Sequence, residues 1–283
     1  MADWPGGARG ALCLSFDNLG EAAEIELGAL GADATLGEHF TATRVLPMLL
    51  DALRTREIAA TFFVEGLNAE LYPEALKAIA AAGHEVGYHA WRHERWGGLS
   101  AGEQAANLAR GIAAFEALDL RPAGLRPPGG GLGSGGLDVI REAGMRYCSP
   151  AGEGAGVEGG VALLPFQWRH VDATCVLPPL APVRERMTGS PDPLDPDAFL
   201  AHLDAEIELL LREGGFAAIV LHLFMLDWLG ENRLAALLDR LTAVARHSEL
   251  WLATGADIAR HVLASPQRFP NGTALDATSW FEE

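Results

Sequence analysis

The sequence predicts an α/β fold, organised as a single distorted β/α barrel. Short apolar segments, typical of strands buried on both faces, alternate with segments of helical periodicity through most of the 283 residues. Polar residues interrupt this pattern where strands end, which is where a β/α barrel builds its active site. Because the Gly- and Pro-rich stretches are short, we expect one domain over residues 1–283.

The first half of the chain predicts four strands and four helices. The strand 11–16 is almost wholly apolar and runs into Asp17. A proline opens the helix at Pro73, and Ser100 with Glu103 is a capping-box signature. Gly144 would cap the fourth helix. The expected strands are 11–16, 59–64, 85–88 and 123–125, and the expected helices are 43–56, 73–82, 100–118 and 137–142.

The second half predicts weaker strands at 145–148 and 161–164, with loops at 129–136 and 152–160. After a proline-rich stretch the pattern becomes clear again. It predicts helices at 197–212 and 231–246 and strands at 216–221 and 249–252.

Composition and charge exclude several partners. A net charge of −17 argues against nucleic acid or anionic membrane, because both require clustered Lys and Arg. It also disfavours a strongly anionic polymer as substrate. No apolar stretch is long enough for a membrane helix, and the opening MADWPGGARG lacks the apolar core of a secretory signal. Cys13, Cys148 and Cys175 are widely spaced, which favours buried reduced thiols and a cytoplasmic protein. A homo-oligomer is compatible with these features.

Four polar residues end predicted strands. Asp17, His89, Arg126 and His222 follow separate strands, and in a β/α barrel such positions converge on one mouth. Any one of them taken alone could equally be a cap or loop residue. His89 and His93, four apart, would lie on one side of a helical turn and could bind one divalent ion at about 2.0–2.1 Å.

These residues stand in motifs that resemble the NodB-homology polysaccharide deacetylases, carbohydrate esterase family 4. The matches occur in family order within residues 11–225. They are Ser15-Phe16-Asp17-Asn18, the segment from Gly83 through His89 to His93, Leu125-Arg126-Pro127-Pro128-Gly129, and Ile219-Val220-Leu221-His222. The resemblance implies a barrel of the NodB-homology type.

The resemblance also implies roles. His89 and His93 would hold a zinc-like divalent ion, with cobalt, nickel or iron as alternatives, together with an acidic residue of the first motif. The ion would polarise an amide carbonyl and lower the pKa of its water. Asp17 would be the general base, paired with and oriented by Arg126. His222 would protonate the departing amine.

Two departures from the family pattern are important. The family has two consecutive aspartates, whereas Asp17 is followed by Asn18, whose neutral oxygen is a weaker metal ligand. Asn18 could ligate weakly, Asp17 could shift to the metal, or Glu21 or Glu24 could compensate. The family's aspartate–tryptophan motif is poorly matched, and Asp172 could orient His222 or serve in a turn.

The expected substrate is a small amide or N-acetyl sugar-like molecule. The apolar residues 223–226 after His222 resemble the intracellular, allantoinase-like branch of the superfamily. The aromatic residues near the expected mouth would form either a stacking floor or core packing. They are Trp91, Trp96, Trp168 and Phe224.

Two other functions stay open. A catalytically inactive barrel that binds a ligand or partner is consistent with Asn18. A dinucleotide-dependent oxidoreductase is the more remote alternative, since Gly131–Gly136 formally matches GxGxxG. For the latter the context is poor, because Pro127-Pro128 separates the glycines from the strand and no acidic residue ends a strand about 20 residues on.

Overall fold

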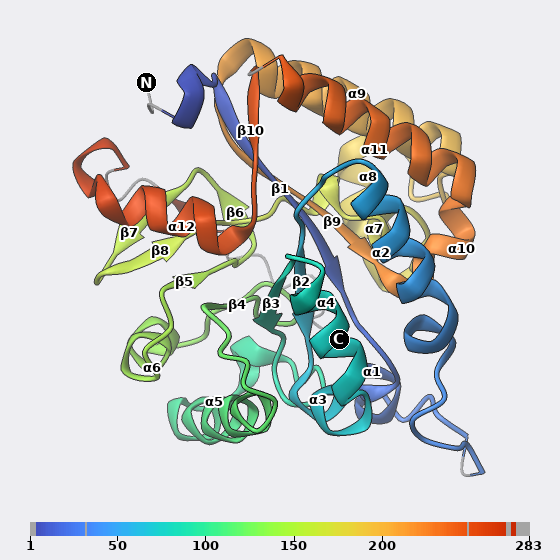
Figure 1. The fold of residues 1–283 in the computed structure, drawn as a ribbon, viewed down its shortest axis with the longest axis vertical. Helices are drawn as coiled ribbons and strands as arrows, with labels where there is room; N and C mark the ends of the chain where they lie inside the picture. The colour runs from blue at the N-terminus through green and yellow to red at the C-terminus, as the bar shows by residue number, and fades with distance from the viewer. Residues whose placement is uncertain (1–3, 32, 248, 270–272, 276–283) are drawn as a thin grey trace.

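The computed structural model describes residues 4–31, 33–247, 249–269 and 273–275 (Figure 1). Its main element is a curled sheet in which every pairing is parallel except β7 with β8. The strands of this sheet are β1 (Gly10–Asp17), β2 (Thr61–Val64), β3 (Glu85–Tyr88), β4 (Gly124–Leu125), β5 (Tyr147–Cys148), β7 (Gly156–Glu158), β8 (Val161–Leu163), β9 (Gly215–His222) and β10 (Leu250–Leu252).

β1 lies at the centre of the sheet. It pairs with β9 along its whole length, from Gly10 opposite Gly215 to Asp17 opposite His222. On its other edge, β10 pairs with its first residues and β2 with its last. All eight of its residues are buried, as expected for a strand with neighbours on both edges. This register places the carboxyl ends of β1 and β9 side by side.

The sheet curls until its far side meets β9 again. Beyond β8, Val171 forms an isolated parallel bridge with Val220 of β9, and Ala151 bridges Phe166. The sheet order β10-β1-β2-β3-β4-β5-β8-β7, with β9 joined to β1, therefore wraps around an interior. The predicted distorted β/α barrel is confirmed.

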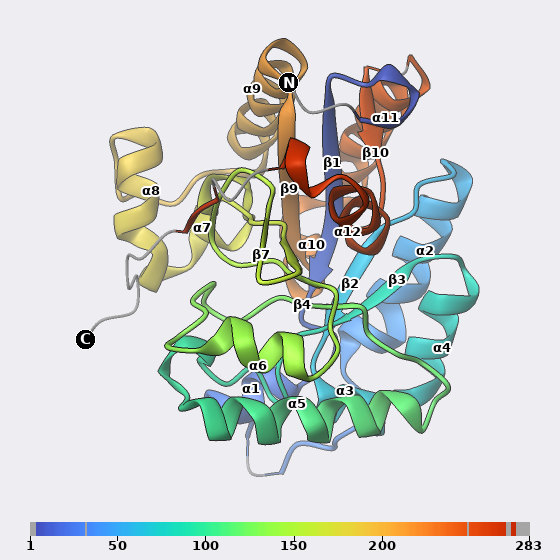
Figure 2. The same cartoon turned by 90° about the vertical axis from the view of Figure 1, so that its left-hand side faces the viewer.

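Helices cover the outside of this sheet. The long α5 and the short α6 lie side by side, and α9 packs against α11 (Figures 1 and 2). No described helix is both long and apolar enough to span a membrane. The helices are α1 (Ala22–Glu26), α2 (Leu46–Thr55, after a π-helical turn at Thr41–Val45), α3 (Gly66–Leu71), α4 (Pro73–Ala81), α5 (Ala101–Glu116), α6 (Gly136–Glu142), α7 (Ala173–Val176), α8 (Ala181–Thr188), α9 (Pro196–Glu213), α10 (Leu226–Leu229), α11 (Glu231–Arg246) and α12 (Gly255–Ala264).

The expected strands and helices are present within a few residues of their predicted bounds. The capping box of α5 is complete: Ser100 accepts from the Glu103 backbone N–H, and the Glu103 carboxylate accepts from the Ser100 N–H. Gly144 follows α6 with φ 78°, a conformation that glycine adopts without strain. Local periodicity and capping residues therefore predicted most of the strands and helices.

The predicted loop at 152–160 is wrong. β7 turns back antiparallel onto β8 through Gly159 and Gly160, which both have positive φ. A separate two-stranded ladder joins β6 (Gly152–Glu153) to β11 (Ala274–Leu275). The glycines that indicated a loop thus serve a hairpin turn. The sequence pattern also does not predict six helices of the structure, which are α1, α3, α7, α8, α10 and α12.

Residues of the sheet alternate between two hydrophobic clusters. Leu12 and Leu14 belong to the cluster that includes the α2 and α5 side chains, whereas Ala11 and Cys13 belong to a second cluster with Phe63 and Tyr147. This period of two is what a strand with two buried faces requires. The predicted burial of the three cysteines is confirmed, and each is free: Cys13, Cys148 and Cys175.

We expect two glycine substitutions in α5 to have opposite effects. A Cβ at Gly111 would lie 2.2 Å from the ring of Tyr88, the last residue of β3, whereas a Cβ at Gly102 meets nothing within 4 Å. Gly111→Ala should therefore lower the free energy of unfolding by about 1–3 kcal/mol through overpacking. Gly102→Ala should raise it by up to about 1 kcal/mol through helix propensity. Urea unfolding measures both, and equal stability of Gly111→Ala and wild type would contradict the close packing of α5 on β3.

Candidate active site

A buried ion pair joins β1 to the end of β4. Arg126 Nη1 donates to Asp17 Oδ1 at 2.8 Å and to Ser15 Oγ at 2.8 Å. Its Nη2 donates to Ser149 Oγ at 3.1 Å, and its Cζ lies 4.2 Å from the ring centre of Phe63. Asp17 and Arg126 are both almost fully buried. Each charge is therefore compensated inside the barrel, as a buried ion requires.

His89 is held by the same arginine. Its Nδ1 lies 2.8 Å from the Arg126 carbonyl oxygen, so Nδ1 carries the proton and Nε2 keeps its lone pair. That Nε2 lies 3.9 Å from Asp17 Oδ2. Burial lowers the pKa of His89 to about 3, and the nearby positive charge of Arg126 adds to this. The imidazole is thus neutral at pH 7 and available as a ligand.

His93 lies beside His89, but not through a helical turn. Their ring centres are 4.9 Å apart at an interplanar angle of 72°. The predicted helical turn at 89–93 is wrong, because Ala90 and His93 have φ of 62° and 75°, which a right-handed helix excludes. Instead a loop brings the two rings together, and its Ala90 and Trp91 carbonyls accept from the first N–H groups of α3. Burial lowers the pKa of His93 to about 3 as well.

His222, at the end of β9, is oriented by Asp172. Its Nδ1 lies 2.6 Å from Asp172 Oδ1, and its backbone N–H donates to Asp172 Oδ2 at 2.7 Å. Burial acts to lower the pKa of His222, but Asp172 and then Asp17 outweigh it and raise the pKa above its ordinary value. Asp172 reaches this position because Val171 bridges Val220, two residues before His222.

Asn18 contacts Glu65, which is not among the predicted site residues. Asn18 Nδ2 donates to Glu65 Oε1 at 2.6 Å, and Asn68 Nδ2 donates to Glu65 Oε2 at 2.9 Å. Glu65 is fully buried, and burial raises its pKa to about 8. No salt bridge between described residues involves it, so a cation placed nearby would be favourable. Glu65 directly follows β2, and the rule that selected the other strand-end residues would have found it.

Glu21 and Glu24 have other partners. The Glu21 carboxylate accepts from the Tyr72 hydroxyl and from the Gly37 backbone N–H. Glu24 Oε1 pairs with His39 Nε2 at 3.3 Å. Among the described residues, neither glutamate contacts Asn18 or the two histidines through a hydrogen bond or ion pair.

The side chains at this end of the barrel offer three donor atoms for a divalent metal only when the amide oxygen of Asn18 is included. Two neutral imidazoles, the buried His89 and the partly buried His93, offer lone pairs, and Asn18 supplies an amide oxygen. Among the described residues, no three or more His, Cys, Asp or Glu side chains are grouped so as to hold a metal. The third ligand would therefore be neutral, which is unusual for a dication site.

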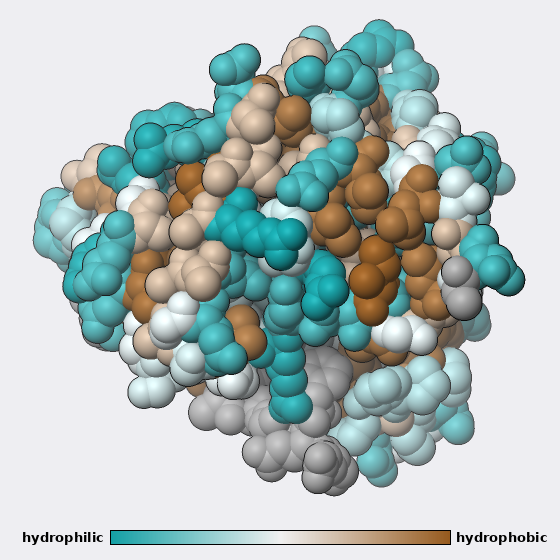
Figure 3. Space-filling model, turned by 90° about the horizontal axis from the view of Figure 1, so that it is seen from below, coloured by the Kyte–Doolittle hydropathy of each residue, from teal (hydrophilic) through white to brown (hydrophobic). Residues whose placement is uncertain are grey.

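The aromatic residues expected at the mouth divide into two groups. Trp91 and Trp96 are buried, and Arg110 stacks on Trp91 with its Cζ 3.6 Å from the ring centre. Phe224 is only partly buried, and its ring centre lies 5.2 Å from that of His222. Figure 3 shows the end toward which β1 runs, where hydrophilic side chains gather near the middle. Of these aromatics, Phe224 is therefore placed beside the candidate general acid.

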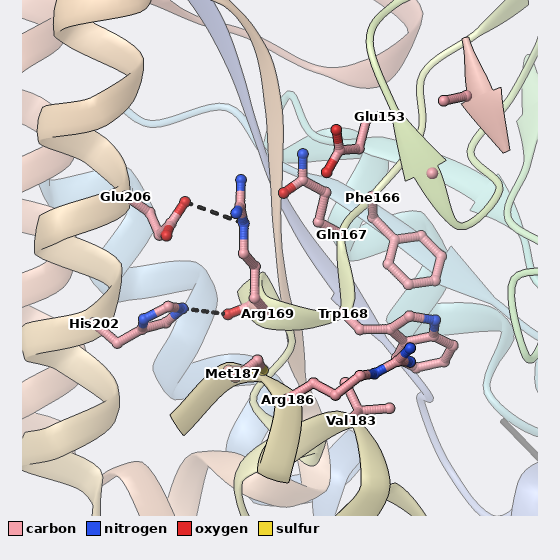
Figure 4. A pocket seen from close by; sticks show the side chains of 12 residues that line it. Glu153, Phe166, Gln167, Trp168, Arg169, Val183, Arg186, Met187, His202 and Glu206 are labelled. Atoms are coloured by element: carbon pink, nitrogen blue, oxygen red, sulfur yellow. Dashed lines mark hydrogen bonds and ion pairs between the residues drawn. The ribbon is translucent and has the colours of Figure 1, made fainter. Parts of the chain in front are cut away.

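A hollow of about 590 Å³ lies beside this centre (Figure 4). Trp168 and Phe166 line it, together with Arg169, whose Nε lies 3.2 Å from Glu206 Oε2. Asp17, His89, His93, Arg126 and His222 are not among its lining residues. Phe166 connects the two regions, because its ring centre is also 5.2 Å from Cζ of Arg126.

Comparisons with known proteins find a polysaccharide deacetylase domain in part of this chain. Residues 32–148 match the family model described as polysaccharide deacetylase, a segment that contains His89, His93 and Arg126. A peptidoglycan-N-acetylglucosamine deacetylase of Bacillus cereus is 33% identical over 101 residues, which are 35% of this chain and 47% of that protein. The chain thus spans less than half the length of the curated relatives it matches.

Solved structures extend the likeness to nearly the whole chain. A putative polysaccharide deacetylase from Mycobacterium smegmatis superposes with a TM-score of 0.79 at 25% identity, covering 97% of this chain and 96% of that one. Puue allantoinase superposes with a TM-score of 0.72 at 21% identity, covering 93% and 94%. The resemblance found in the motifs is confirmed: residues 32–148 match a polysaccharide deacetylase domain, and nearly the whole chain shares the fold of a putative polysaccharide deacetylase.

Proposed function

We propose that this protein is a metal-dependent hydrolase of a C–N amide bond in a small or carbohydrate-like substrate. One observation carries the proposal. Asp17 and His222 are register partners on neighbouring strands, one held by Arg126 and the other by Asp172. A base and an acid oriented separately at one strand end are what amide hydrolysis needs.

Asp17 is the proposed general base. Its Oδ1 is occupied by Arg126, while Oδ2 lies 3.9 Å from His89 Nε2, so the second oxygen is directed toward the histidine pair. A water molecule between these groups would give its proton to Asp17 as it attacks the carbonyl carbon. The arginine keeps the carboxylate in one orientation during this step.

The proposed metal ligands are His89, His93 and the amide oxygen of Asn18. A divalent ion, most simply zinc, with cobalt, nickel or iron as alternatives, would polarise the carbonyl and acidify its water. The chain's own contribution is to keep both imidazoles neutral by burial and to fix the tautomer of His89 through the Arg126 carbonyl.

His222 is the proposed general acid. Its raised pKa keeps it protonated further into the neutral range than an ordinary histidine. Asp172 accepts from Nδ1–H, which leaves Nε2–H to protonate the departing amine. Phe224 packs beside the ring and would limit the water around the leaving group.

The substrate class follows from charge and from the relatives. Peptidoglycan, chitin and allantoin-related names among the similar proteins describe amide-bearing molecules. A chain of net charge −17 binds a neutral or cationic amide more readily than an anionic polymer. We therefore propose a small amide or an N-acetyl sugar, acted on by one domain within the cytoplasm.

Asn18 favours a second candidate, a catalytically inactive barrel that keeps the fold and binds a ligand.

The dinucleotide alternative is weaker. The glycine-rich loop packs against the start of α5, where Gln104 Nε2 donates to the Leu132 carbonyl and a Cβ at Gly133 would lie 2.9 Å from the same nitrogen. These contacts account for Gly133 without a cofactor.

The metal content of the purified protein tests the proposed ligands. Protein prepared without chelator should contain about one divalent ion per chain, and His89→Ala/His93→Ala should contain none. Elemental mass spectrometry measures this, with the exposed His247 replaced by alanine as a matched control. Wild-type protein that is metal-free and takes up none on titration would favour the inactive barrel instead.

Activity on small N-acetyl and ureido compounds tests the base and the acid. Asp17→Asn and His222→Gln should each lower kcat/KM by about 10²- to 10⁴-fold. Asp51→Asn, which changes an exposed carboxylate on α2, should leave kcat/KM unchanged. Folding of each variant is compared by circular dichroism, and activity that survives both site substitutions would argue against these roles.

Asp172→Asn should lower the pKa of His222. The carboxylate is the main group raising this pKa against burial, so its loss leaves desolvation dominant. The pKa of His222 is higher in the folded protein than in the unfolded chain. The His222–Asp172 pair therefore stabilises the fold fully at a pH below the unfolded pKa, and this stabilisation is lost as the pH rises through the folded pKa. NMR titration of the imidazole C–H signals measures the shift, with His222→Gln assigning the resonance. An unchanged or higher pKa would show that Asp172 is not the controlling partner.

A further inference from the structure

Glu206 is a charged residue on the apolar side of α9. The buried residues of this helix are Phe199, Leu203, Ile207 and Leu210, which recur at helical spacing. Glu206 follows Leu203 by three residues and precedes Leu210 by four, so it shares their face of the helix. Its side chain keeps only 17% of its surface exposed. A carboxylate in such a place is costly unless other groups compensate it, and the proposed mechanism does not use this one.

The partners of Glu206 come from the 3₁₀ turn Trp168–His170. Glu206 Oε2 accepts from His170 Nε2 at 3.0 Å, and Arg169 Nε lies 3.2 Å from the same oxygen. One helical turn earlier on α9, His202 Nε2 donates to the Arg169 carbonyl at 2.9 Å. Figure 4 shows both contacts to Arg169, one with its side chain and one with its backbone. Two successive turns of α9 therefore hold this one 3₁₀ turn.

The ionisation states of Glu206 and His170 suit these contacts. The hydrogen bond from His170 lowers the pKa of Glu206 below its ordinary value, so the carboxylate is charged at pH 7 and can only accept. Burial lowers the pKa of His170, so its ring is neutral and Nε2 carries the proton that Glu206 accepts. Nδ1 of the same ring is buried and has no hydrogen-bond partner within the described part of the chain. The ring of His170 is therefore fixed through Glu206.

Asp172 follows this turn by two residues. Between them, Val171 bridges Val220 of β9, and the Asp172 N–H donates to the Val220 carbonyl at 3.2 Å. The Asp172 carboxylate then contacts the ring and the backbone N–H of His222. β9 thus holds one end of this short segment, while α9 holds the other. Because the two ends are so close in sequence, a shift of the turn would move the Asp172 carboxylate relative to His222.

We propose that Glu206 is a positioning residue for the general acid: it fixes the turn Trp168–His170 against α9 and so keeps Asp172 in place to orient His222. The inference rests on the role of His222 in the hydrolase proposed above. The described hydrogen bonds and ion pairs of Glu206 reach the turn and not Asp172 or His222, so Glu206 acts through the intervening backbone. The orientation of the proposed acid thus depends on a helix outside the barrel.

A double-mutant cycle in the pKa of His222 tests this inference. Glu206→Gln keeps the size of the side chain but removes its charge, so it holds Arg169 and His170 less firmly. The pKa of His222 should then fall toward the value found in Asp172→Asn, while Asp17 and Arg126, the other charges that act on His222, stay unchanged. In the Asp172→Asn background Glu206→Gln should lower the pKa no further, because the effect passes through Asp172. NMR titration of the imidazole C–H signals measures all four proteins.

Two acetylated substrates separate misplacement of the acid from a general distortion of the site. An amide needs a proton on its departing amine, whereas an activated phenyl ester releases a phenolate that leaves without one. Glu206→Gln should lower kcat on the N-acetyl amide by about 10- to 100-fold, the effect of a small misplacement of a reacting group. It should change kcat on the ester by less than about three-fold, because that step does not use the acid.

Glu208→Gln is the matched control. Glu208 lies on the same helix and also pairs with an arginine, Arg240 of α11, but it is exposed and does not contact the turn. Its substitution should leave the pKa of His222 and both rates unchanged. His202→Ala removes the other α9 contact and should act in the same direction as Glu206→Gln. Circular dichroism and thermal unfolding verify folding, and His202→Ala decides the question where Glu206→Gln does not fold.

The outcomes are distinct. A lower pKa of His222 only where Asp172 is present, with a loss confined to the amide, supports the inference. An unchanged pKa in Glu206→Gln and His202→Ala would show that β9 alone positions Asp172, and an equal fall in both backgrounds would show that Glu206 acts by charge alone. Either result overturns the inference and leaves the proposed hydrolase standing. Wild-type protein that hydrolyses neither substrate overturns the proposed function, whereas the NMR cycle still decides whether Glu206 positions Asp172.

Discussion

The rest of the site depends on one buried ion pair, between Arg126 and Asp17. Removing two charges from water is costly, and the cost is recovered only with close geometry and further hydrogen bonds. Here the guanidinium reaches Asp17 and Ser15 of β1 and Ser149 beyond β5, and it lies over the ring of Phe63. The small residues Cys13 and Ala218 lie around this side chain inside the barrel. Packing and electrostatics therefore select the same position for Arg126.

Arg126 also positions the ring of His89. The Arg126 side chain fixes Asp17, while its carbonyl oxygen fixes the ring of His89. A displacement of the chain after β4 would thus move the proposed base and the first proposed ligand together. His222 is held independently, through Asp172 and the bridge between Val171 and Val220. The site consequently consists of two units, one around Arg126 and one around Asp172, which meet because β1 and β9 are in register.

The fold and part of the site could be predicted from the sequence, and physical reasons explain which parts could not. Buried parallel strands have a simple apolar pattern, and a polar residue at the end of such a strand is conspicuous, which is how Asp17, His89, Arg126 and His222 were found. The segment 165–195 has prolines and no clear period, so α7 and α8 were not predicted. The spacing of His89 and His93 is compatible with a helical turn, but left-handed residues, invisible in a residue pattern, bring the rings together instead. The pairing of Asp172 with His222 was one of two alternatives left open by the sequence, because it depends on a register between segments 50 residues apart that no local pattern encodes.

Asn18 is best understood together with Glu65. Burial raises the pKa of Glu65, and the nearby carboxylate of Asp17 raises it further. Arg126 is already paired with Asp17. An aspartate at position 18 would bring a further carboxylate into contact with Glu65 and would oppose the ionisation of Glu65 still more. The Asn18 amide adds no charge there and donates to Glu65 through Nδ2. A glutamate at position 65 and an asparagine at position 18 are therefore mutually consistent choices, and a change at either position alters what the other must be.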